Sequence, residues 1–153
     1  MILQTANLSP AGSKFSGEET SEIFEWPVDG NAIVHPSGPL RWKFMAKLFG
    51  DELLIEGKVS AEFSGVCARC GCDMVFEIAE PLCFSVEISD EIAEVDLTSE
   101  LRDAILLALP NHPVCKTDCQ GVCPTCGKPL SEGSCTCSGI KNTSPWDTLN
   151  ELG

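Results

Sequence analysis

The chain has 153 residues, a net charge of −13, 43% hydrophobic residues and ten cysteines. This composition suits one domain of modest core with an appendage and excludes a chain that is disordered throughout. It contains no run of about 18 apolar residues, as a transmembrane helix would need, and residues 1–4 lack the basic start of a secretory signal. We therefore expect a cytoplasmic protein with no membrane partner.

Residues 1–39 are predicted to be an N-terminal arm and a turn-rich lead-in. Residues 1–20 are rich in Ser, Gly, Glu and Thr, which is typical of a loose arm with room for a short strand. Three prolines and two glycines follow within residues 27–39, and these residues favour turns.

Residues 40–110 are predicted to form the core, beginning with an antiparallel β-meander. Apolar and polar side chains alternate along residues 41–48 and, after a turn at Gly50 and Asp51, along residues 53–63. The same alternation returns at residues 74–78 and, past Pro81, at residues 82–88. A period of two indicates half-buried strands. Cys83 lies inside the last strand and is predicted to be a buried small hydrophobe.

One helix is predicted after the acidic residues 89–96, which are interpreted as a solvated loop. Asp96 or Thr98 can cap this helix, and Pro110 ends it. Apolar side chains fall on one helical face, at Leu97, Leu101, Ala104, Ile105, Ala108 and Leu109. The predicted fold class is α+β: an antiparallel meander or small barrel-like sheet, one packed helix, and a cysteine-rich, zinc-ribbon-like segment at residues 111–137. Residues 138–153 form a tail that either anchors on the body or binds a partner.

The C-terminal cysteines are the primary metal prediction. Cys123 and Cys126 have the spacing of a zinc knuckle, and Gly127 allows the positive φ of such a turn. Cys135 and Cys137 supply a second pair. Four thiolates satisfy a closed, tetrahedral, structural Zn²⁺ site.

A secondary metal site is predicted at the connection between two strands, where Cys67 and Cys70 form another knuckle. Cys115 and Cys119 are the unused candidates for its other two ligands, although either could instead join the C-terminal cluster. Cys72 could substitute as a ligand or be a spare thiol. A bare pair with this spacing could also be redox active, although it joins two strands here rather than starting a helix.

No catalytic constellation is visible. The sequence lacks a phosphate-cradling glycine loop, a GxSxG motif and an HExxH motif, and it contains only two histidines. A closed four-cysteine site leaves no metal position open for water. We therefore expect a protein that acts by binding and is not an enzyme.

Several motifs together resemble the YceD family of large ribosomal RNA subunit accumulation proteins, in a cysteine-rich variant. The resemblance spans roughly residues 40–150 and implies a role in accumulation or processing of large-subunit (23S) ribosomal RNA, without established catalytic residues. It implies that zinc stabilises the fold. The motifs that carry it are Cys67-Ala68-Arg69-Cys70, Cys83-Phe84, Asp96-Leu97, residues 101–110, residues 121–127 and residues 145–149.

The charge distribution bears on the partner. Residues 67–110 hold two basic and ten acidic side chains, a net charge of −8, which would repel phosphates and attract a basic protein. We expect a basic ribosomal protein or a pre-large-subunit particle as partner, with possible large-subunit rRNA contact through Arg41, Lys43 and Lys47. The alternatives are a zinc-ribbon nucleic-acid-binding protein, for which Lys116, Lys128 and Lys141 are few, and a thiol redox or metal-sensing protein.

Overall fold

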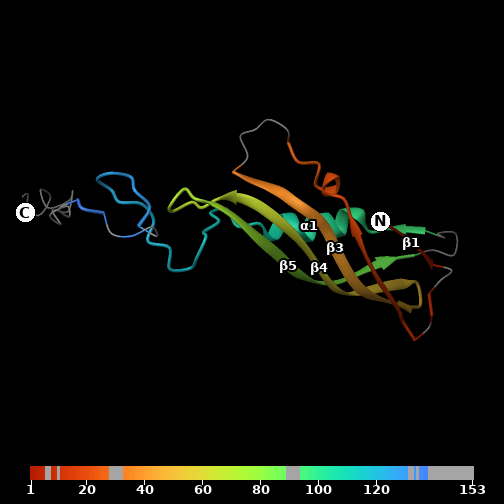
Figure 1. The fold of residues 1–153 in the computed structure, drawn as a ribbon. Coiled ribbons are helices and arrows are strands. Elements are labelled where there is room, and N and C mark those ends of the chain that lie inside the picture. The colour runs from red at the N-terminus through yellow and green to blue at the C-terminus, as the bar shows by residue number, and fades with distance from the viewer. Residues whose placement is uncertain are drawn as a thin grey trace, which may run out of the picture.

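The computed structural model describes residues 1–137 except 6–7, 10, 28–32, 89–93, 131–132 and 134. The predictions for the tail at 138–153 and for Asp90 and Glu91 therefore lie outside the described residues. The main sheet is antiparallel and open, with strand order β2–β3–β4–β5 (Figure 1). Its strands are β2 Ser13–Glu19, β3 Val34–Phe49, β4 Glu52–Val66 and β5 Asp73–Glu87.

Three smaller elements complete the fold. A two-stranded sheet pairs β1 (Ile2–Gln4) with β6 (Glu94–Asp96). A short 3-10 helix, η2, covers Ser21–Phe24, and the helix α1 covers Thr98–Ala108. Figure 1 shows α1 lying across one face of the main sheet, with the cysteine-rich segment leading away from the end of the β4–β5 hairpin. The predicted α+β class is confirmed.

The core follows directly from the alternation in β3, β4 and β5. In β4, the side chains of one parity are 0–1% exposed, while those between them face solvent or the sheet's outer side. The buried set in β4 consists of Leu53, Ile55, Val59, Ala61 and Phe63. Glycines occupy the two remaining positions of that parity, Gly57 and Gly65. At Gly57, β3 approaches too closely for a side chain, because a Cβ there would lie 2.2 Å from the Lys43 carbonyl oxygen.

The helix buries the apolar face predicted for it. Leu97, Leu101 and Ile105 are fully buried, and α1 packs against β4, β5 and η2. Leu97 is the N-cap residue, while the Asp96 carboxylate accepts a hydrogen bond of 3.0 Å from the Thr98 backbone N–H. The Thr98 hydroxyl and this N–H hold the pKa of Asp96 below its usual value. The Asp96 carboxylate thus stabilises the start of the helix, although Asp96 lies one residue before the N-cap position.

Residues 1–39 take a larger part in the fold than a loose arm would. They supply β1, β2, η2 and the first residues of β3, which begins at Val34 despite its prolines. The register between β3 and β4 shifts between Pro36 and Leu40, so an irregularity accommodates the residues that favoured turns. Phe24 is buried, and its ring centroid lies 5.4 Å from that of Phe63.

The burial predicted for Cys83 is wrong. Leu82 of β5 faces the core, so its neighbour Cys83 points to the opposite side of the sheet and is exposed. Pro81 shares that outer parity and sits within β5 without ending the strand, because β5 has a neighbour on one side only.

The helix face provides a direct stability test. Ile105→Ala should lower the free energy of unfolding by about 2–5 kcal/mol, because the truncation leaves a cavity at a fully buried site. Leu107→Ala is the matched control: Leu107 is 88% exposed, so its loss should change stability by about 0.5 kcal/mol at most. Urea unfolding followed by circular dichroism measures both. Equal effects would contradict the packing of α1.

Candidate metal centres

The first candidate centre joins the tip of the β4–β5 hairpin to the segment that follows α1. Its ligands are Cys67 and Cys70 from the tip, with Cys115 and Cys119 from the later segment, and their sulfurs all lie within 4.8 Å of one another. Cys67 Sγ is 3.9 Å from Cys119 Sγ, and Cys70 Sγ is 3.7 Å from Cys115 Sγ. The structure thus brings together the four residues predicted as the secondary site.

Backbone geometry shapes the hairpin tip. The Cys67 N–H donates to the Cys72 carbonyl at 2.9 Å, and the Gly71 N–H donates to the Cys67 carbonyl at 2.9 Å. Gly71 has φ +73°, a conformation that a residue with a side chain rarely adopts. This turn directs the Cys67 and Cys70 sulfurs toward the same point.

Arg69 attaches the later segment to the tip. Its guanidinium donates to the Cys119 carbonyl at 3.1 Å and to the Thr117 carbonyl at 3.4 Å. The neighbouring Ala68 N–H donates to the Pro113 carbonyl at 2.8 Å. Sequence reasoning noted Arg69 only as part of a motif, because nothing in the spacing shows that it contacts carbonyls about fifty residues away.

The second candidate centre contains all four of the primary predicted ligands, Cys123, Cys126, Cys135 and Cys137, again within 4.8 Å of one another. The Cys123 and Cys135 sulfurs are 3.3 Å apart. The Gly127 N–H donates to the Cys123 carbonyl at 2.8 Å, and Gly127 has φ +72°, as the knuckle pattern predicts. The two centres therefore use different cysteines, and Cys115 and Cys119 do not join the C-terminal cluster.

The first cysteine of each knuckle is prepared to be a thiolate. Backbone N–H groups of Cys115 and Cys70 lower the pKa of Cys67 to about 5. Backbone N–H groups of Cys126 and Thr125 lower the pKa of Cys123 to about 6. Thiolate is the form that binds metal, so these contacts favour metal over protonated thiol at neutral pH. A set of four sulfurs suits one tetrahedral, soft or borderline ion and leaves no position for a substrate.

Comparisons with known proteins show what part of the chain is similar to. Residues 85–153 match the family model described as "Large ribosomal RNA subunit accumulation protein YceD". This segment of the chain is thus similar to the YceD family. The segment includes α1, Cys115, Cys119 and the whole second centre.

Individual relatives are similar to parts of this chain. Uncharacterized proteins of Mycobacterium tuberculosis and Mycobacterium bovis are 34% identical over 94 residues, covering 52% of this chain and 45% of theirs. The chain thus spans about half the length of the curated relatives it matches. A Zea mays protein named "Large ribosomal RNA subunit accumulation protein YCED homolog 1, chloroplastic" is 38% identical over 55 residues, covering 34% of this chain and 19% of its own. No solved structure gives a significant match.

Cys72 adds a fifth thiol beside the first centre. Its sulfur lies 3.1 Å from Cys70 Sγ, and its side chain is partly buried against the centre. It is not among the four sulfurs that are mutually close. This position is compatible with both predicted roles, a substitute ligand and a spare thiol.

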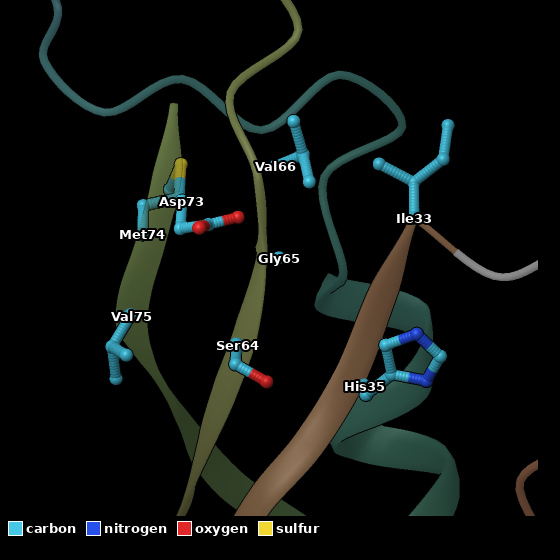
Figure 2. Close-up of a pocket in the computed structure, with 8 residues that line it drawn as sticks. All are labelled: Ile33, His35, Ser64, Gly65, Val66, Asp73, Met74 and Val75. Atoms are coloured by element: carbon cyan, nitrogen blue, oxygen red, sulfur yellow. The ribbon is translucent and has the colours of Figure 1, made fainter. Parts of the chain in front are cut away.

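A hollow of about 430 Å³ borders the knuckle on the outer side of the sheet (Figure 2). Its rim includes the exposed apolar side chains Ile33 and Val75. His35, Ser64 and Asp73 also line it, and His35 is the ladder partner of Ser64. No side-chain hydrogen bond joins these three described residues, and Asp73 lies on the far side of β4 from His35. The hollow therefore holds the residue types of a catalytic relay without its contacts.

No described helix is long and apolar enough to cross a membrane.

The independence of the two centres can be tested by removing one ligand. Cys126→Ser should lose about one metal ion per chain and the amide protection of the second centre, while the sheet stays protected because its core contains none of these residues. Elemental analysis and hydrogen exchange give the two readouts. Cys83→Ser, which removes an exposed thiol outside both centres, should change neither. Loss of protection in β4 for the Cys126 variant would contradict separate folding.

Proposed function

We propose that this chain is a ribosome-biogenesis factor that supports accumulation or processing of large-subunit (23S) ribosomal RNA in the cytoplasm, by binding and without catalysis. The YceD match over residues 85–153 carries this proposal, because the family is described by its role in large ribosomal RNA subunit accumulation. Two observations on the described residues agree with it. Both four-cysteine centres are closed, and the polar residues of the hollow in Figure 2 form no relay.

We further propose that both centres hold zinc as a structural ion. Thiolate sets of this kind suit zinc, and the segment needs a metal: apart from cysteines, the buried residues that the structure describes in 111–137 are Pro113 and Gly121. Neither brings a large apolar side chain. Metal coordination would therefore supply the folding free energy that a core supplies elsewhere.

The zinc proposal is tested by elemental analysis of protein purified under reducing conditions without chelator. The expected result is two zinc ions per chain, and a chelator should abolish amide protection across residues 113–137 before it affects β3 and β4. A stoichiometry of two iron atoms, or a metal-free protein with the same protection, would contradict zinc as the structural ion.

The partner is proposed to be a basic ribosomal protein, free or on a pre-large-subunit particle, held by the acidic edge of the sheet. We define this acidic edge as two like-charged pairs on the outer face of β4 and β5, on the β5 side of the sheet. The pairs are Glu62 opposite Glu77 and Glu52 opposite Glu87, and all four residues are exposed. Like charges directly opposite each other in a sheet are destabilising. A basic surface docked on the edge would relieve this repulsion.

The acidic edge can be tested by reversing one of its pairs. Glu62→Lys with Glu77→Lys should abolish salt-sensitive co-sedimentation with large-subunit precursors and raise the ratio of precursor to mature 23S RNA in cells that contain only the variant. Glu22→Lys with Glu100→Lys makes the same change in net charge away from the edge and should behave like the wild type.

Two results would contradict the proposals. Normal RNA maturation in cells with the edge variant would remove the acidic edge as the partner surface. Normal 23S RNA levels in a deletion strain would overturn the biogenesis role itself.

A further inference from the structure

The outer face of the main sheet gathers half of the basic residues of this acidic chain. Five of the ten lysines and arginines lie on three adjacent strands and share the parity that faces away from the core. Buried Phe44 and Ala46 alternate with them along β3. The five are Lys14 on β2, Arg41, Lys43 and Lys47 on β3, and Lys58 on β4.

These five cations fall into two groups. Arg41 Nε lies 3.8 Å from a Glu18 carboxylate oxygen, and Lys47 Nζ lies 3.0 Å from Glu56 Oε2. Lys14, Lys43 and Lys58 have no ion pair among the described residues. The set expected from sequence to contact RNA was Arg41, Lys43 and Lys47, and the structure leaves only Lys43 of that set without a carboxylate partner.

The three unpaired lysines surround one hollow. Lys43 is directly opposite Lys58 in the β3–β4 register, and Lys14 is opposite Met45, two positions along β3 from Lys43. All three are exposed. With Phe44, Met45, Glu56 and Gly57 they line a depression of about 380 Å³, which we call the lysine hollow.

The lysine hollow is unfavourable for folding alone. Cations placed directly opposite each other destabilise a sheet, and an exposed strand position accepts neutral polar residues equally well. A bound anion with several separated charges would remove the repulsion. The three ammonium groups act as point charges, and lysine binds phosphate in this way. The arginine on this face, Arg41, is already engaged by Glu18.

We propose that Lys14, Lys43 and Lys58 form a contact site for the phosphates of an RNA strand. This inference rests on the proposed function, which supplies RNA as the polyanion that the protein meets. The net charge of −13 repels RNA at long range, so its affinity for the protein should be modest. The attraction should act only when phosphates lie close to the lysines, within the distance over which salt does not screen them. The lysine hollow and the acidic edge would then present RNA and a basic protein with neighbouring parts of one sheet.

The test uses full-length protein and a fluorescein-labelled, unstructured single-stranded RNA 20-mer, followed by anisotropy between 25 and 200 mM salt. Replacing three phosphate contacts, in Lys14→Gln/Lys43→Gln/Lys58→Gln, should weaken binding about tenfold or more at the lowest salt. It should also reduce the slope of log K against log salt by about 2, since each contact to a single strand contributes about 0.7. Thermal stability should not fall, because the variant removes a repulsion.

The equal-charge control is Arg41→Gln/Lys116→Gln/Lys128→Gln. It removes one ion-paired residue of the same face and two lysines of the cysteine-rich segment, and it should keep the wild-type slope. If the control loses RNA binding while the lysine-hollow variant keeps it, the contact belongs to the cysteine-rich segment and the proposal is wrong. No wild-type binding at 25 mM salt would also overturn it. The proposal would also be wrong if a poly-glutamate peptide displaced the labelled RNA as effectively, per charge, as unlabelled RNA does.

These outcomes separate the RNA site from the proposed function. Binding is measured on purified protein, whereas the biogenesis role is measured by 23S RNA levels in a deletion strain. Binding with normal RNA levels would overturn only the role, and disturbed RNA levels without binding would overturn only the lysine hollow.

Discussion

The attachment of the C-terminal segment to the tip of the β4–β5 hairpin is the contact on which the arrangement of both metal centres depends. The long β4–β5 ladder fixes the tip in register with the core. Arg69 and the four sulfurs of the first centre then fix the segment that leaves α1. Gly121, close to the Arg69 carbonyl, leads directly to Cys123 of the second centre. The described residues of 113–123 form no apolar core that could hold this segment in place without the tip.

The sheet distributes its chemistry by parity. One side supplies the apolar residues that α1 covers, and the other carries charged residues that pair across strands with like partners at Lys43–Lys58 and Glu62–Glu77. A cross-strand pair of like charges destabilises the sheet, whereas a pair of opposite charges does not. Charged residues that lie opposite a like charge are therefore the ones available to a partner, and those in ion pairs serve the structure. This distinction is the basis of both binding proposals.

Sequence patterns predicted much of this structure because they are local. Alternation located β3, β4 and β5, helical spacing located Leu101 and Ile105, and short cysteine spacings located the knuckles. Residues 94–96, interpreted as part of a solvated loop, instead form β6. Long-range contacts carry no such signal: the pairing of β1 with β6 and the carbonyl contacts of Arg69 depend on residues far apart in the chain. The prediction that Cys83 is buried was wrong, although the alternation around it was clear. Its parity in that alternation already placed it on the outer side of the sheet.

The position of Pro81 in β5 has a consequence for how copies of this chain meet. An edge strand offers unpaired backbone groups to any other strand, which is a route to aggregation. Pro81 has no N–H to offer, and exposed Glu77 and Glu87 would place like charges against a second copy. The same carboxylates that are proposed to attract a basic protein therefore discourage a second copy from pairing with β5 edge to edge.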